Sequence, residues 1–289
     1  MSNVARELWR VVEPYHQVAY RSPEAAAAYE ALGLLAAPQQ YFANRLAVLG
    51  PIGATTAAAV LFGFNPAYVG SVVPAVWSIA DPRAVCAARQ KAAGACLRRV
   101  IPGIDSSPRI ESFAATARAL VERLDYAGSP IGAAAYDQAY PSDPVVALWH
   151  SFTVLREHRG DAHWRATAAH GIDPVECHIL HAADGAMPED LLQRVTGWDN
   201  AAWKAATTRL VSRGLIVAAN ESLSLTHDGR ITKRAIEAAT DAHADSSIQA
   251  VGVERVLDLR EALRPWIALI MDADIIGAWK MREALWRDE

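Results

Sequence analysis

The sequence predicts a mainly α-helical fold, with a helical N-terminal domain followed by a winged helix-turn-helix that carries a two-stranded wing. Three observations support this prediction. Alanine and arginine, both strong helix formers, are abundant, and arginine outnumbers lysine 24 to 4. Proline and glycine divide most of the chain into helix-length segments. Between Pro174 and Thr240 the elements follow the order helix, helix-turn-helix, hairpin, helix.

The N-terminal helices are predicted from their start and stop residues. Ser22-Pro23-Glu24 supplies a cap, a proline in the first turn and an acid, so a helix begins there and ends at Gly33. Asp81-Pro82 begins another helix in the same way. The helices expected in this region span residues 23–32, 37–49, 55–62, 67–79, 82–100 and 109–126.

The second half of the chain begins with the longest predicted helix, from Pro144 to Ala169. The winged-helix pattern follows it. Its helices are expected at residues 174–183, 188–195, 200–212 and 226–240, and its two strands at 215–218 and 222–225. The last segment, Val253 to Arg287, again reads as helix, with apolar positions at Trp266, Ile267, Ile270, Trp279 and Trp286.

We expect three domains from this pattern. Residues 1–140 form a helical domain, and residues 141–250 contain the long central helix and the winged helix-turn-helix. Residues 251–289 form C-terminal helices that either pack back on the N-terminal helices or make a homodimer contact.

Composition excludes several classes of protein. A hydrophobic fraction of 52% with 21% charged residues excludes a disordered chain. The net charge of -4 gives no general attraction to nucleic acids or anionic membranes. Cys86, Cys96 and Cys177 form no CxxC pair, which excludes a disulfide scaffold or zinc ribbon and fits the reducing cytoplasm. Walker A, GxGxxG and GxSxG motifs are absent, so no cofactor is predicted.

One segment resembles a membrane span. No charged residue occurs from Leu46 to Ala80. Gly50, Pro51, Gly53 and Pro66 divide the segment into pieces too short to cross a bilayer as one helix. Acids and a base near the N-terminus also interrupt any secretory signal. We therefore expect a cytoplasmic protein with no membrane partner.

A polar cluster on the long helix is the main candidate site. Arg156, Arg159 and His163 continue an apolar helix face, and buried charge is costly unless it is paired. Either an internal carboxylate or the anionic group of a ligand should meet the two guanidinium groups. The alternative is that these side chains reach solvent near the end of the helix.

His158 and Asp161 lie one turn apart on the opposite face, where an aspartate could orient a general base. His158, Asp161 and His163 are the candidate catalytic residues, and a surface pair is the alternative. His178, His181 and Asp184 have helical spacing, but they match no established metal motif, so no metal is predicted.

A second wall for this site is suggested by aromatic and polar residues around the uncharged segment. Tyr41, Arg45, Asn65 and Trp77 are the candidate substrate-binding residues, together with Arg156 and Arg159. A packed core explains the same aromatic residues equally well.

The predicted second helix of the helix-turn-helix offers a nucleic-acid interface as the alternative site. Lys204, Thr208, Arg209 and Arg213 could contact phosphates and base edges. The predicted wing tip, Asn220-Glu221-Ser222, carries an acid where a base would suit DNA. From Pro174 to Thr240, eight acids oppose seven bases, so overall charge does not favour DNA binding.

The chain resembles an actinobacterial helix-turn-helix family of unassigned function over most of residues 5–240. The matching motifs are YFANR at 41–45 with Leu49-Gly50, FGFNP at 62–66, Val76-Trp77 and, most specifically, LREHRGDAH at 155–163. Asn44 and Leu46 stand where small residues are expected in that family. The resemblance implies a role in small-molecule biosynthesis or its regulation and assigns no catalytic residue.

Three functions are consistent with these observations. The first is a small-molecule-binding protein of specialised metabolism, including a metal-independent biosynthetic enzyme acting on an anionic substrate. The alternative is a ligand-responsive winged-helix transcriptional regulator, with DNA as its partner. A structural adaptor that dimerises through the C-terminal helices is a third reading.

Overall fold

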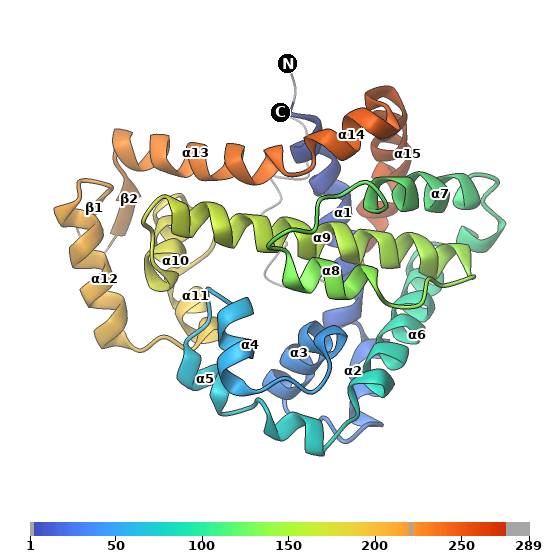
Figure 1. Ribbon diagram of the computed structural model, residues 1–289, viewed down its shortest axis with the longest axis horizontal. Coiled ribbons are helices and arrows are strands. Elements are labelled where there is room, and N and C mark those ends of the chain that lie inside the picture. The colour runs from blue at the N-terminus through green and yellow to red at the C-terminus, as the bar shows by residue number, and fades with distance from the viewer. Residues whose placement is uncertain (1–2, 220–221, 276–289) are drawn as a thin grey trace. The chain divides into compact units, whose positions relative to one another are not determined.

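The computed structural model describes residues 3–219 and 222–275, which form α-helices, short 3-10 helices and one two-stranded antiparallel sheet (Figure 1). This confirms the predicted fold class. The described chain forms two compact units. The first unit draws on Met1–Ile52, Val72–Asp161 and Asp241–Glu289, and the second on Gly53–Ser71 and Ala162–Thr240. The predicted three-domain division remains a prediction about independently folding parts.

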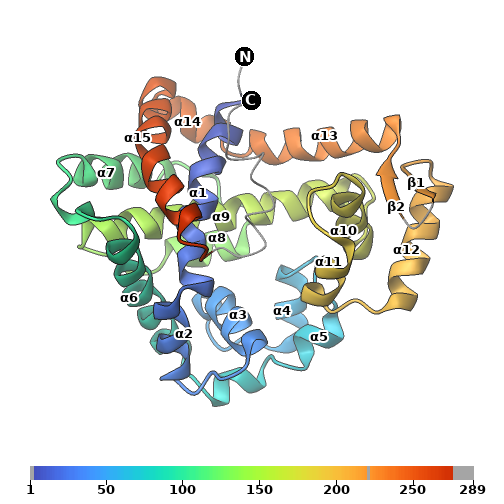
Figure 2. The ribbon, with the colours of Figure 1, turned by 180° about the vertical axis from the view of Figure 1, so that it is seen from behind.

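The first unit is built from helices around α1 (Val4–Arg21). Helix α1 packs against α2, α6 and α15, and Figure 2 shows α15 lying across it. The other helices of this unit are α2 (Pro23–Glu30), α3 (Ala37–Leu46), η1 (Ala47–Leu49), η2 (Ala75–Ser78), α6 (Pro82–Val100), η3 (Ile104–Ser106), α7 (Ile110–Val121), α8 (Pro130–Tyr136), α14 (Asp245–Val251) and α15 (Val253–Asp272).

Two longer helices contain the boundaries between the units. They are α9 (Pro144–Ala169) and α13 (His227–Ala242). Every residue of α9 from Val145 to Leu155 is buried, so this part of the helix has no solvent face. Trp149 lies at the centre of the first unit, stacked on His16 with an interplanar angle of 7°.

The second unit contains α4 (Ala54–Val60), α5 (Pro66–Gly70) and the winged helix. The winged helix consists of α10 (Pro174–Ala183), α11 (Glu189–Thr196), α12 (Asn200–Ser212), β1 (Ile216–Ala219), β2 (Ser222–Leu225) and α13. The strands pair with Ile216 opposite Leu225 and Ala219 opposite Ser222. The predicted elements of this region are all present.

Residue chemistry explains why these elements begin and turn where they do. The Asp173 and Asp199 side chains accept backbone N–H groups at the starts of α10 and α12. Gly197 has φ +77° in the turn between α11 and α12, and a Cβ there would lie 2.5 Å from the Tyr68 ring. Trp203 and Leu210 of α12 pack in the core of this unit with the buried faces of α10 and the strands.

Some predicted boundaries are wrong. The single helix expected over residues 67–79 is two short helices, α5 and η2, because Pro74 has no N–H with which to continue the helix. Helices α1 and α8 were not predicted. Helix α15 fulfils the first part of the expected C-terminal helix, whereas Trp279, Trp286, Asn220 and Glu221 lie outside the described residues. None of the helices within residues 3–219 and 222–275 is long and apolar enough to span a membrane.

Candidate functional site

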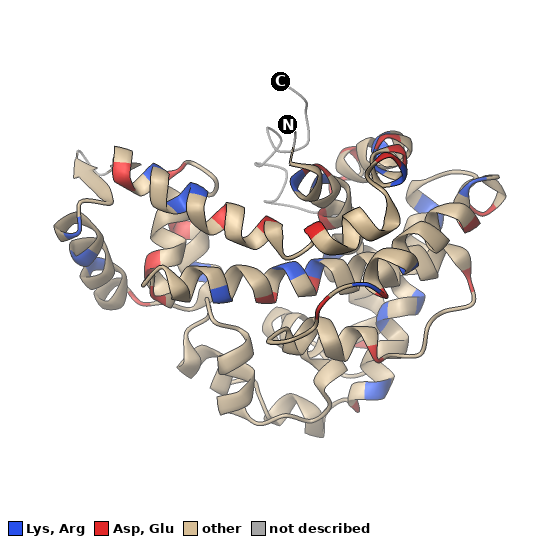
Figure 3. Ribbon diagram, turned by 45° about the horizontal axis from the view of Figure 1, so that its top comes forward, with Lys and Arg blue, Asp and Glu red and all other residues tan. Residues whose placement is uncertain are grey.

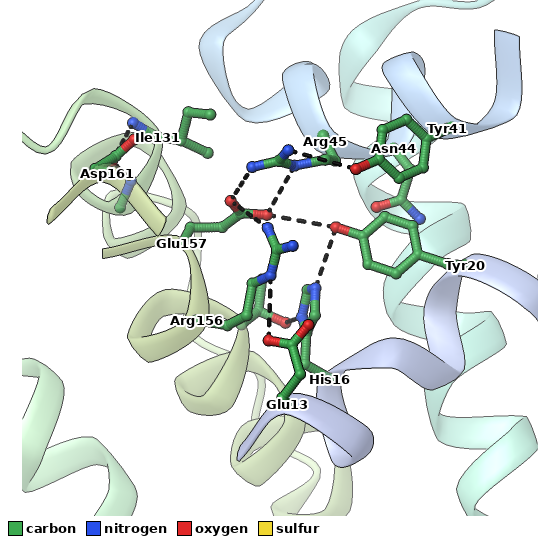
Figure 4. Close-up of polar contacts among 12 residues, drawn as sticks. Glu13, His16, Tyr20, Tyr41, Asn44, Arg45, Ile131, Arg156, Glu157 and Asp161 are labelled. Atoms are coloured by element: carbon green, nitrogen blue, oxygen red, sulfur yellow. Dashed lines mark hydrogen bonds and ion pairs between the residues drawn. The ribbon is translucent and has the colours of Figure 1, made fainter. Parts of the chain in front are cut away.

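A buried network of ion pairs lies in the first unit, where α3 and α9 meet α1 (Figure 4). Arg45 of α3 is 2.8 Å from the Glu157 carboxylate, and Arg156 approaches the same Oε2 atom at 2.9 Å. Arg156 also lies 3.5 Å from Glu13 of α1. The Tyr20 hydroxyl donates to Glu157 over 3.4 Å. One carboxylate is thus shared by two guanidinium groups.

Electrostatics keeps this network ionised. Burial opposes ionisation of Glu157, but the positive charges of Arg156 and Arg45 outweigh it and hold the pKa of Glu157 well below its usual range. Burial and the neighbouring Arg156 together lower the pKa of His16, so this imidazole is neutral near pH 7. Glu157 therefore stays ionised between the two arginines, and His16 adds no charge to them near pH 7.

Arg159 has a separate partner. Its guanidinium donates to Asp241 at 3.0 Å and lies 4.7 Å from the centre of the Trp9 ring. Asp241 also accepts from Arg6 at 2.9 Å and from Asn3 at 2.7 Å. This carboxylate joins the start of α1 to α9 through charge-assisted hydrogen bonds.

Internal carboxylates therefore provide the negative charge that the sequence predicts beside Arg156 and Arg159. Tyr41 and Arg45 belong to the same cluster, since Arg45 donates to the Tyr41 hydroxyl at 3.4 Å. The burial of these arginines is explained without an anionic ligand. Their assignment as substrate-binding residues remains a prediction.

The candidate catalytic residues make structural contacts. His158 and Asp161 are both buried, although the surface-pair alternative expected them in solvent. The His158 imidazole donates to the backbone carbonyl of Asp125 at 2.8 Å. Asp161 accepts the N–H groups of Ile131 and Gly132, at 3.0 and 2.9 Å, at the start of α8. Burial raises the pKa of Asp161 to about 6.

The remaining candidates of the predicted pocket lie in different units. Trp77, in the first unit, donates to the backbone carbonyl of Ile52 at 3.0 Å. Asn65, in the second unit, caps α5 through Ala67 and donates to the carbonyl of Gly197 at 2.9 Å. His163 also belongs to the second unit, where its Nδ1 atom lies 3.1 Å from the Thr240 hydroxyl.

The candidate nucleic-acid interface is the exposed face of α12. Lys204, Thr208 and Arg209 are all exposed on this helix, and the Thr208 hydroxyl donates to the carbonyl of Lys204. The ribbon of α12 carries basic positions and no acidic one (Figure 3). This arrangement has the side-chain chemistry that a recognition helix needs.

Both predicted DNA-binding arginines already have carboxylate partners at the start of α10. Arg209 pairs with Asp173 and lies 3.1 Å from Glu176, and Arg213 lies 2.9 Å from Glu176. Glu176 itself is buried. Phosphate groups would have to compete with these acids for both arginines, which lowers the electrostatic affinity that α12 could offer.

The acids that hold the basic residues were not identified from the sequence. The sequence predicts no functional role for Glu13 or Asp241. The available signal for Glu13 was its position between Val12 and Tyr15, among apolar residues of a helix. Arg156, Arg159 and His163, which the sequence places on the apolar face of α9, are half-buried, whereas Glu157, His158 and Asp161 are buried.

Comparison with known protein families gives a match over nearly the whole chain. The profile of a family described as the helix-turn-helix family matches residues 5–277. No curated protein and no solved structure matches the chain.

Proposed function

The chain belongs to this helix-turn-helix family, and from that premise we propose that it is a DNA-binding regulator with α12 as its recognition helix. The observation that carries the proposal is the exposed basic and hydroxyl face of α12, within a complete order of winged-helix elements. We further propose a cytoplasmic location, which the three free cysteines support because thiols persist in a reducing compartment.

The ion pairs of Arg209 and Arg213 determine how tightly DNA should bind. Asp173 and Glu176 neutralise Arg209 and Arg213 in the free protein. Lys204 is exposed on the same helix and offers a charge for a phosphate. We therefore expect weak binding to DNA of arbitrary sequence, and tight binding only where base contacts add to a few phosphate contacts.

Selection from randomised duplexes tests this function. The selected duplex is labelled, and its affinity is measured by fluorescence anisotropy at several salt concentrations. Lys204→Ala should weaken binding several-fold and reduce the slope of log affinity against log salt by about 1. Lys91→Ala, which removes an exposed lysine from α6 in the first unit, is the matched control and should change neither quantity.

Two results would contradict this proposal. If no duplex is enriched over the starting pool, and a mixed-sequence duplex does not bind at low salt, the protein is not a DNA-binding regulator. An equal loss of affinity in Lys204→Ala and Lys91→Ala would place the contact elsewhere than on α12.

A small-molecule ligand of the first unit is the second candidate, and His150 is the observation that favours it. His150 is 1% exposed, and neither ring nitrogen has a hydrogen-bond partner among the described residues. A buried polar group without a partner costs free energy, which a bound polar molecule would recover. Titration with specialised metabolites should quench tryptophan fluorescence, and unchanged emission with every compound would remove this candidate.

The regulator could act as a homodimer, and the ligand-binding protein could act as an enzyme. The proposed dimer contact is α15, whose Leu269 side chain is exposed. Light scattering at micromolar concentration would give twice the monomer mass for a dimer, and the mass of one 31.2 kDa chain would reject it.

An enzymatic activity would require His158 and Asp161 to leave their backbone hydrogen-bond partners during turnover.

A further inference from the structure

We propose that His163, Cys177 and His181 bind a divalent zinc-like cation in the second unit. One ligand atom from each of the three residues lies within 4.8 Å of the other two. A thiolate with two imidazoles is a ligand set that zinc prefers, and calcium and magnesium disfavour. This site does not depend on the proposed DNA binding.

Two helices position the three side chains. Cys177 and His181 are four residues apart on α10, so they share one face of the helix, one turn from each other. His163 comes from α9, and its ring centre lies 5.9 Å from that of His181. Ligand atoms around tetrahedral zinc lie about 3.3–3.8 Å apart, given zinc bonds of about 2.0–2.3 Å. Small rotations of the histidine side chains therefore close the observed separation.

The hydrogen bonds of Thr240 prepare His163 for this role. The Thr240 hydroxyl donates its proton to the carbonyl of Ile236 at 2.7 Å, so its oxygen acts as the acceptor for His163. The Nδ1 atom of His163 must then carry the proton, and in the neutral ring Nε2 carries the lone pair. Metal-binding histidines usually donate their second ring nitrogen in this way, which orients the imidazole.

Cys177 would bind the cation as a thiolate, so its proton must leave to solvent when the metal enters. Cys177 is 4% exposed. Burial raises the pKa of the thiol to about 12, so without a metal it is a neutral and weak nucleophile. Three ligands also leave a fourth position on a tetrahedral cation for water or a nearby acid.

The sequence pattern could not identify this site. His178 was grouped with His181 by helical spacing, but the His178 ring donates to the carbonyl of Gly63 at 2.7 Å. The third ligand comes instead from His163, on a preceding helix, and no spacing within α10 reveals it. Metal sites assembled from two helices require the fold before they can be found.

Cobalt titration of the full-length protein tests the site. The purified chain is treated with a chelator, desalted and titrated with Co²⁺ under reducing conditions. We expect one equivalent to produce a near-ultraviolet thiolate-to-cobalt charge-transfer band and the visible bands of tetrahedral cobalt. Adding Zn²⁺ should remove both signals by displacement. The absence of a charge-transfer band in the wild-type protein would overturn the proposal without any variant.

Variants then assign the ligands. Cys177→Ser should abolish the charge-transfer band, and His163→Gln or His181→Gln should lower cobalt affinity at least tenfold. Cys96→Ala removes another buried cysteine, and His170→Gln removes another histidine close to α9, so both controls should titrate as the wild type does. Circular dichroism verifies that each variant is folded.

A substitution at Thr240, which is not a ligand, tests whether its hydrogen bond orients the His163 ring for the metal. Thr240→Val removes the acceptor of His163 while keeping a side chain of similar size, and should weaken cobalt binding about 10–100-fold. A charge-transfer band that persists in Cys177→Ser would also overturn the proposal, as would equal losses in the ligand variants and the two controls.

Discussion

The Glu157 side chain lies between two guanidinium groups, and its removal should be costly. In Glu157→Gln, Arg45 keeps its charge in a buried position without a carboxylate. Breaking a buried ion pair from one side typically costs about 3–5 kcal/mol of stability. Urea denaturation followed by circular dichroism should show a loss of this size.

The exposed pair Arg118–Glu122 on α7 provides the comparison for that variant. Its two charged atoms are 2.8 Å apart, but both side chains reach solvent. Glu122→Gln should change the free energy of unfolding by at most about 1 kcal/mol. Equal losses in the two variants would mean that burial does not govern the Glu157 network.

His150 makes stability depend on pH. Burial, followed by the positive charge of Arg89, lowers the pKa of His150 to about 4. The Tyr140 ring packs edge-on against it at 5.3 Å and adds no charge near neutral pH. The unfolded chain takes up a proton here below about pH 6.5, while the native chain does not until about pH 4. Stability should therefore fall as pH drops through this window, by on the order of 3 kcal/mol.

Urea denaturation between pH 7 and pH 4 measures this dependence. His150→Leu cannot take up a proton, so its loss of stability across the same range should be smaller by the share that His150 contributes. Parallel curves for the variant and the wild type would assign the acid sensitivity to other groups.

The kind of partner at the arginines was predictable, but the partner residues were not. Arg156 and Arg159 on an apolar face required negative charge, and the structure supplies it from Glu13, Glu157 and Asp241. Asp241 is 82 residues from Arg159, so no local pattern connects them. Only the packing of distant helices determines which acid meets which base.

Among the helices, α13 depends on a close approach at Gly229. A Cβ at this position would lie 1.9 Å from the backbone oxygen of Leu215, which precedes β1. A backbone atom cannot move aside as a flexible side chain can. Gly229→Ala should therefore destabilise the wing by about 2–3 kcal/mol, measured as a lower midpoint in thermal unfolding.

Gly160 is the matched control for that substitution. It lies inside α9, and a Cβ there meets no atom within 4 Å. Alanine is the better helix former, so Gly160→Ala should raise stability by up to about 1 kcal/mol. A similar destabilisation by both alanines would contradict the contact at Leu215.

The pairing between α10 and α12 gives a prediction for the proposed recognition helix. Asp173→Asn retains a side chain that caps α10, but removes one negative charge beside Arg209. Arg209 then keeps Glu176 as its one remaining carboxylate partner among the described residues and is more available to a phosphate, so affinity for the selected duplex should rise several-fold at low salt. Unchanged affinity, measured by anisotropy, would mean that Arg209 does not face DNA.

The starts of helices were predictable because capping depends on neighbouring residues. The buried and exposed faces of helices were harder to predict because they depend on packing. Helices α6, α9 and α10 begin at Asp-Pro pairs, as expected from the sequence. The faces of α9 were not predictable, because Val145 to Leu155 is buried on every side and the buried side of the next two turns carries the polar residues Glu157, His158 and Asp161. The split of residues 67–79 lies where Pro74 has no N–H for a helical hydrogen bond.

At the scale of the whole chain, the second unit is assembled from two separated segments. Gly63 accepts hydrogen bonds from His178 and from Trp198, and Asn65 donates to Gly197. The sequence predicted both segments as helical but gave no sign that they pack together. Their association depends on contacts more than a hundred residues apart.

This assembly predicts how a fragment should behave. Residues 162–240 alone contain the winged helix but lack the segment 53–71, so His178 and Trp198 lose their acceptor. The fragment should melt at a lower temperature than the full chain and bind a hydrophobic dye. Adding back residues 53–71 by fusion should reverse both effects, and a fragment as stable as the full chain would contradict the assignment of these residues to the unit.

The stacking of His16 on Trp149 also has an optical consequence. The rings are nearly parallel, with centres 6.4 Å apart, and the imidazole is neutral near pH 7. An imidazolium quenches indole emission far more strongly than a neutral imidazole does. The emission of Trp149 should therefore fall when acid conditions place a proton on the His16 ring beside it.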